Sequence, residues 1–134
     1  MTMQRSERLD IRSSDDVVRV RQLARTMALA TGLSLVDQTK IITAASELAR
    51  NALDYGGGGF LLAELVDAPG RRGVRLTFED QGPGIADIDA ALKDGFTTGK
   101  GMGLGLGGAK RLCNEFSIHS KPGEGTKVTI ARWK

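Results

Sequence analysis

The chain has 134 residues and a formal net charge of +3 at pH 7, from 19 Lys+Arg and 16 Asp+Glu. This length fits one domain over residues 1–134, and so small a charge excess indicates neither nucleic-acid binding nor binding to an anionic membrane. One Cys and one His exclude an internal disulfide and a zinc site built from such ligands. No apolar leader or membrane-length apolar run is present, so we expect a cytoplasmic protein.

The N-terminal half is predicted to form a short strand and two helices. Residues 8–12 alternate between charged and apolar, which is typical of an edge strand. Apolar residues then recur at helical spacing over 17–28, until Gly32 ends that helix. A second helix is predicted over 34–53. The residues that it places on one polar stripe, at i, i+4 and i+7, are Glu47, Asn51 and Asp54.

The C-terminal half is predicted to contain two hairpins separated by a glycine-rich stretch. Turn-forming residues join the strand-like runs of the first hairpin, and a Lys-Pro-Gly-Glu-Gly turn joins those of the second. The expected elements are strands at 60–66 and 73–79, a helical piece at 87–93, a helix at 109–116, and strands at 117–120 and 127–132.

The expected order of elements, β-α-α-β-β-loop-α-β-β, keeps the helices apart from the hairpins. Such an order is typical of an α/β two-layer sandwich. We therefore predict helices packed on one face of a mixed, mainly antiparallel sheet.

The first candidate site is residues 80–84 (DQGPG), directly after a strand. The Asp80 carboxylate can accept a hydrogen bond from an exocyclic amine, while Gly82 and Gly84 let a flat ring approach the backbone. An ordinary strand-to-loop turn has the same composition and, for this segment alone, is the more common explanation.

The second candidate is residues 97–108 (TTGKGMGLGLGG), where every second residue from 99 to 107 is glycine. Such a segment can curl its N–H groups around an anion, and the helix that follows adds positive potential. Lys100 and the hydroxyls of Thr97 and Thr98 can add donors. No strand and no βαβ unit surround the segment, which argues against a dinucleotide fingerprint. We favour phosphate binding over a flexible linker.

The third candidate is the polar stripe of the second helix. Asn51 offers a neutral oxygen of the kind that binds Mg²⁺ together with phosphate oxygens, and Glu47, one turn away, can act as a general base. A solvated helix face is the usual explanation of such a stripe, and the stripe alone does not decide between the two.

Taken in order, four segments resemble the ATP-binding domain that gyrase, MutL, histidine kinases and the heat-shock chaperone family share, the GHKL or Bergerat fold. They are 47–52 (ELARNA), 80–84 (DQGPG), 101–106 (GMGLGL) and 123–126 (GEGT). Each motif is weak by itself, but four in this order over nearly the whole chain are a strong match. Residues 94–99 and 101–112 are especially similar to the RsbT-type kinases of bacterial partner-switching systems.

The resemblance implies a role for each matched residue. Asp80 would bind the adenine amino group with Thr126 nearby, and Glu47 would be the catalytic base. Residues 87–100 would form a lid. The residues implied to contact ATP are Asn51, which would also bind Mg²⁺, Asp80, Gly82, Gly84, Thr98, Lys100, Gly101, Gly103, Gly105, Leu106 and Thr126.

The implied function is a serine/threonine kinase that uses ATP and Mg²⁺ in a stressosome-like system. Its substrates would be STAS-domain antagonist proteins, and the free kinase would activate a PP2C-type phosphatase by binding it. Two alternatives remain open: an anti-sigma factor kinase that sequesters a sigma factor, and a non-catalytic, ATP-gated partner-binding module. The glycine run at 56–59 also leaves open how the second helix ends.

Overall fold

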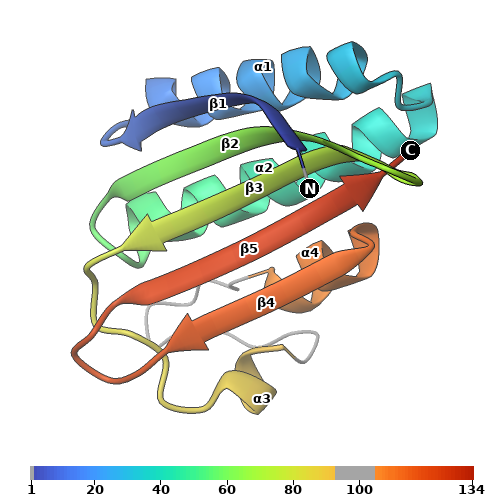
Figure 1. Ribbon diagram of the computed structural model, residues 1–134. Coiled ribbons are helices and arrows are strands. Elements are labelled where there is room, and N and C mark those ends of the chain that lie inside the picture. The colour runs from blue at the N-terminus through green and yellow to red at the C-terminus, as the bar shows by residue number, and fades with distance from the viewer. Residues whose placement is uncertain (1, 93–104) are drawn as a thin grey trace.

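The computed structural model describes residues 2–92 and 105–134. Its elements follow the order that the sequence predicts (Figure 1). They are β1 (Thr2–Ile11), α1 (Ser14–Thr31), α2 (Leu35–Asp54), β2 (Gly59–Ala68), β3 (Arg71–Asp80), α3 (Ile88–Ala91), α4 (Leu106–Leu112), β4 (Glu115–Ser120) and β5 (Thr126–Trp133).

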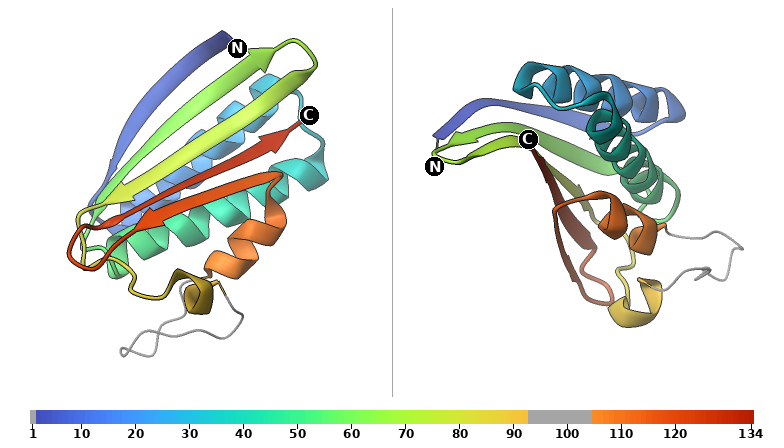
Figure 2. Two further views of the ribbon diagram at one scale, coloured as in Figure 1. Left: turned by 60° about the horizontal axis from the view of Figure 1, so that its bottom comes forward. Right: turned by 90° about the vertical axis from the view of Figure 1, so that its right-hand side faces the viewer.

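The strands form one sheet in the order β1-β2-β3-β5-β4. Helices α1, α2 and α4 lie on one face of this sheet, and this second layer is clearest in the right-hand view of Figure 2. The predicted two-layer α/β sandwich is therefore confirmed. One detail differs, because all four strand pairings in the described part of the chain are antiparallel and the sheet is not mixed.

Local sequence explains where the two long helices begin and end. The Asp16 carboxylate accepts a hydrogen bond from the backbone N–H of Ser13 (3.2 Å), and Gly32 ends α1 with a φ of 78°. At the start of α2, Ser34 Oγ accepts from the Asp37 N–H (3.1 Å). These features set where the two helices begin and where α1 ends.

The core lies between the helix layer and the inner face of the sheet. The buried face of α2 is rich in alanine, which lets its backbone approach the strands closely. The bulkier side chains come mainly from the strands. Residues that are completely or almost completely buried in this layer include Ala44, Ala45, Leu48 and Ala49 of α2, and Leu61, Leu76, Phe78 and Ile130 of the sheet.

Two predicted elements have different limits in the structure. The helix expected over 109–116 is α4, which ends at Leu112, and Phe116 lies in β4. Half-buried and exposed residues alternate along β4, which is the pattern of a strand with one covered face. Strand β1 is ten residues long rather than short. Within residues 2–92 and 105–134, no helix combines the length and apolarity that crossing a membrane requires.

Candidate active site

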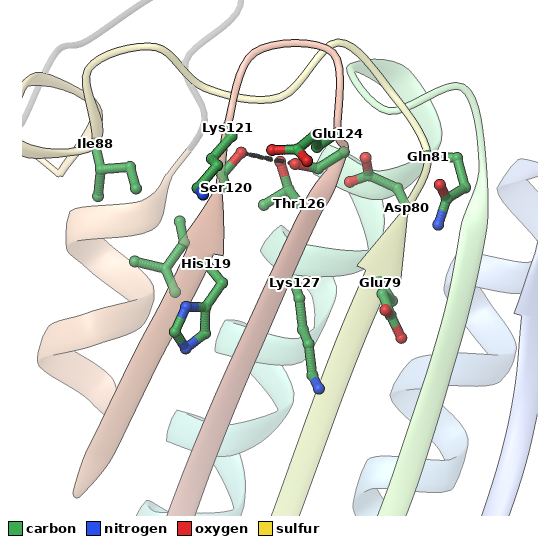
Figure 3. A pocket seen from close by; sticks show the side chains of 12 residues that line it. Glu79, Asp80, Gln81, Ile88, His119, Ser120, Lys121, Glu124, Thr126 and Lys127 are labelled. Carbon is green, nitrogen blue, oxygen red and sulfur yellow. Dashed lines mark hydrogen bonds between the residues drawn. The ribbon is translucent and has the colours of Figure 1, made fainter.

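Three polar residues form a row across one end of the sheet. Asp80 ends β3, Thr126 begins β5 and Ser120 ends β4, and the strand register pairs Thr126 with both of the others. Directly paired residues point to the same face of a sheet. Because Phe78 and Val128, two residues along their strands, are buried, the row lies on the face that the helices cover. Figure 3 shows the row beside the β4–β5 turn.

Asp80 is a buried carboxylate, only 9% exposed. Its Oδ1 accepts a hydrogen bond from the Gly82 N–H (2.9 Å), and the backbone N–H of Thr126 donates to the same carboxylate. Burial raises the pKa of Asp80 above its ordinary value of 3.8, although both hydrogen bonds favour the charged form. No cation among the described residues forms an ion pair with it. A buried carboxylate with a raised pKa and no ion-pair partner among the described residues is typical of a binding site.

The glycine run after α2 brings the backbone against Asp80. A Cβ on Gly56 would overlap the Asp80 carboxylate, and a Cβ on Gly82 would lie 2.6 Å from the Gly56 Cα. Both positions therefore require glycine for close approach. The glycine run therefore ends α2 directly against residues 80–84, which settles how the helix ends.

Tyr55, the C-cap of α2, reinforces this contact. Its hydroxyl donates a hydrogen bond to the carbonyl of Gly84 (2.9 Å), and its side chain lines a pocket together with Asp80. The hydrogen bond holds the turn that contains Gly84 against the end of α2. The sequence pattern gave no reason to select Tyr55.

Two hollows meet at Asp80 and Thr126. One is narrow and mostly apolar, and Asn51 lies in its wall. The other is an open cavity of about 410 Å³ at the end of the sheet, a size within the usual range of small-molecule sites (Figure 3). The apolar residues of the narrow pocket are Leu48, Ala52, Phe78, Ile85, Leu106 and Val128.

Glu47 lies against the start of α4. It is exposed on α2, and a Cβ on Gly105 would lie only 2.5 Å from the Glu47 Oε2 atom. Gly105 precedes α4 with a φ of 64°, a backbone conformation that favours glycine. The fold therefore brings Glu47, on the polar stripe of α2, against Gly105 of the glycine-rich segment 97–108.

Most of the predicted site residues are gathered around the C-terminal half of α2 and the end of β3. Four predicted site residues lie outside the described residues: Thr98, Lys100, Gly101 and Gly103. The part of the predicted lid beyond residue 92 lies outside them as well. Ser120 was not selected from the sequence. Its signal was its place directly before the predicted turn at 121–125, opposite Thr126. Those brought together are Glu47, Asn51, Asp80, Gly82, Gly84, Gly105, Leu106 and Thr126.

Known proteins resemble the chain in sequence and in fold. Residues 36–134 match the family described as histidine kinase-, DNA gyrase B-, and HSP90-like ATPase. The chain is 48% identical over 118 residues to the serine/threonine-protein kinase RsbT of Bacillus subtilis (strain 168), covering 88% of this chain and 89% of that protein. It is 30% identical over 108 residues to an anti-sigma F factor of Shouchella clausii (strain KSM-K16), covering 74% and 71%.

A solved structure shares the fold. The crystal structure of the RsbU and RsbW domains of Rv1364c from Mycobacterium tuberculosis superposes with a TM-score of 0.66 at 22% identity, over 97% of this chain and 33% of that one. The family match covers more than half of the chain, and the similarity to RsbT extends over most of both proteins. The chain therefore belongs to the histidine kinase-, DNA gyrase B- and HSP90-like ATPase family and, within it, to the RsbT-type serine/threonine-protein kinases, which use ATP.

Proposed function

We propose that this chain is the switch kinase of a cytoplasmic, bacterial partner-switching system. It transfers the γ-phosphoryl group of ATP to a Ser or Thr of an STAS-domain antagonist protein and, when free, activates a PP2C-type phosphatase by binding it. The observation that carries the proposal is that Asn51 of α2 and Asp80 of β3 line one pocket, while Glu47 lies one helical turn from Asn51 and against Gly105. The similarity to RsbT over most of the chain supports the same role.

The adenine base binds where the two hollows meet. There the Asp80 carboxylate accepts a hydrogen bond from the exocyclic amine, and the apolar side chains at the edge of the narrow pocket can pack against the ring. The absence of side chains at Gly56 and Gly82 lets the backbone pack directly against Asp80 and holds the carboxylate in place. The amine would add a hydrogen-bond donor to the backbone N–H groups of Gly82 and Thr126, which already donate to the buried Asp80 carboxylate.

The side-chain oxygen of Asn51 is suited to hold Mg²⁺. It is neutral and lies in the same pocket as Asp80, and Mg²⁺ binds through few protein oxygens and several phosphate oxygens. When bound, the ion would neutralise charge on the phosphates of ATP. An ion held by Asn51 would lie near Glu47, because the two residues are one helical turn apart on the same stripe of α2.

Glu47 accepts the proton of the attacking hydroxyl. As the Ser or Thr oxygen bonds to the γ-phosphorus, the bond from that phosphorus to the β–γ bridging oxygen breaks and ADP leaves. Glu47 is exposed, so the side chain of a protein substrate can reach it. The glycine at position 105 leaves its carboxylate uncovered by a neighbouring side chain.

Phosphate transfer from labelled ATP tests the proposal. The purified chain is incubated with γ-labelled ATP and STAS-domain proteins encoded beside it, and the modified residue is mapped by mass spectrometry. We expect labelling of one Ser or Thr on a cognate STAS protein. ATP binding without transfer to any cognate protein would contradict the proposal.

The 30% identity to an anti-sigma F factor favours a second candidate function. In that case the chain would sequester a sigma factor and phosphorylate its antagonist. Co-purification from cells with a tagged chain separates the two functions. A PP2C-type phosphatase in the complex supports the switch kinase, whereas a sigma factor supports the anti-sigma role.

A further inference from the structure

Ser120 links two loops of the site. Its Oγ accepts a hydrogen bond from the backbone N–H of Ile85 (2.8 Å), and it lies 2.8 Å from the Gly125 carbonyl and 2.9 Å from the Thr126 Oγ1. Ile85 directly follows residues 80–84, and Gly125 precedes β5. Ser120 therefore joins the loop after Asp80 to the turn before Thr126.

The available protons fix the direction of each bond. A serine hydroxyl has one proton to donate and two sites that accept. The Ile85 N–H occupies one accepting site, and the Gly125 carbonyl, which can only accept, takes the proton. The remaining contact is satisfied only if the Thr126 hydroxyl donates its own proton to Ser120. The Thr126 oxygen is then left with accepting capacity alone.

Thr126 lines both hollows beside Asp80. We propose that Ser120 is a positioning residue that sets the base selectivity of the site, because it fixes the Thr126 hydroxyl as a hydrogen-bond acceptor. The inference rests on the proposed function, in which the base binds at Asp80. Both polar side chains that meet the base there then accept, so the site favours a 6-amino purine. A 6-oxo purine presents a carbonyl where a donor is needed.

Removing the Ser120 hydroxyl removes the acceptor to which the Thr126 hydroxyl donates, and it leaves Thr126 itself in place. In a Ser120→Ala variant the Thr126 hydroxyl is free to rotate and can donate to a 6-oxo group. Ser120→Thr is the matched control, because it keeps the hydroxyl and suits a strand. A role in folding alone would lower stability in Ser120→Ala but would leave base selectivity unchanged.

Calorimetric titration with ATP and with inosine triphosphate (ITP), which has a carbonyl in place of the 6-amino group and a hydrogen on N1, measures the selectivity. We expect the ratio of the ITP Kd to the ATP Kd to fall about fivefold in Ser120→Ala, the value of one neutral hydrogen bond. Ser120→Thr keeps the ratio of the unmodified chain. Thermal unfolding verifies that each variant is folded, and Ser120→Cys replaces Ser120→Ala if the latter does not fold.

A double-mutant cycle with Thr126→Val tests whether Ser120 acts through Thr126. Once the Thr126 hydroxyl is absent, adding Ser120→Ala should leave the ratio unchanged. An equal fall in the presence and absence of that hydroxyl would overturn the inference.

The outcomes distinguish this inference from the proposed function. If ATP binding depends on Asp80 but Ser120→Ala leaves the ITP-to-ATP ratio unchanged, the role of Ser120 is wrong and the base site stands. If Asp80→Asn leaves ATP affinity unchanged, the base site itself is wrong, and the inference fails with it.

Discussion

Two aspartates near opposite ends of β5 have opposite electrostatic environments. Asp37, in the first turn of α2, accepts a hydrogen bond from the Arg132 guanidinium (2.7 Å), and this bond holds the pKa of Asp37 below its ordinary value. Asp80, beside Thr126, is enclosed without an ion-pair partner among the described residues, and burial raises its pKa. The same type of side chain is neutralised at one end of the strand and left unneutralised at the other.

The difference separates the part of the molecule that holds the fold from the part that binds. Arg132 also donates to the carbonyl of Leu112 (3.2 Å), so its contact with Asp37 joins α2, α4 and β5. Asp80 is packed against Gly56 and also lines the open cavity at the end of the sheet. Substitutions at the two ends should therefore affect different properties, stability at one and binding or transfer at the other.

The largest effect is expected at Glu47, which belongs to the binding end. Glu47→Gln should lower the rate of phosphate transfer by about 10²- to 10⁴-fold, the usual contribution of a general base. ATP affinity should stay within about twofold, because Glu47 is exposed and does not line the base pocket. Labelled-phosphate transfer and calorimetry measure the two quantities, and unchanged transfer would remove Glu47 from the reaction.

Asp80→Asn should weaken ATP binding by about tenfold to hundredfold, because a charged acceptor is lost from a buried hydrogen bond. It should not lower the free energy of unfolding at pH 7. The pKa of Asp80 is higher in the folded state than in the unfolded state. Protonated Asp80 therefore stabilises the fold below the unfolded-state pKa, and this stabilisation is lost as pH rises through the folded-state pKa. The neutral amide avoids that loss. Denaturant unfolding measures stability, and a clear drop would show that Asp80 mainly holds the fold.

The pH dependence of ATP binding provides a third difference between the ends. As pH falls, Asp80 should be protonated at a higher pH than an ordinary aspartate, and ATP affinity should fall with it. The Asp80→Asn variant should lack this acid-side loss, whereas Asp37→Asn should retain it. Titrations from pH 7 downward measure the effect, and an identical profile in all three proteins would contradict the assignment.

The smallest effect is expected at Asp37. Asp37→Asn should lower the free energy of unfolding by about 0.5–1 kcal/mol, because the pair with Arg132 is partly exposed to solvent. The folded pKa of Asp37 is lowered, so this contribution is present above the unfolded pKa and disappears as pH falls through the folded one. Denaturant unfolding at neutral and acidic pH measures it, and altered ATP affinity at pH 7 would break the separation of the two ends.

Local signals in the sequence predicted most of the fold. Ser34 and Gly32 mark helix limits through side-chain capping and a positive φ, which depend only on neighbouring residues. Phe116 was assigned to a helix because it lies four residues after Leu112, a spacing that fits a helical face. In the structure it follows the two-residue alternation of β4 instead.

The arrangement of the site was harder to predict, because it depends on contacts between distant segments. Strand register places Asp80 opposite Thr126, and neither composition nor motif spacing fixes that register. The contact of Gly56 with the Asp80 carboxylate depends on how α2 packs over the sheet. The pairing of Ser120 with Thr126 does follow from the predicted turn. The hydrogen bond between their hydroxyls could be seen only in the structure.

The central claim is that α2 and the end of β3 form one nucleotide site. Calorimetric titration with ATP tests it most directly, with and without Mg²⁺, on the unmodified chain and on Asn51→Ala. Asn51 and Asp80 come from different layers and line the same pocket. The account predicts Mg²⁺-dependent binding that Asn51→Ala largely abolishes while the variant stays folded. Equal binding by both proteins at every Mg²⁺ concentration would contradict it.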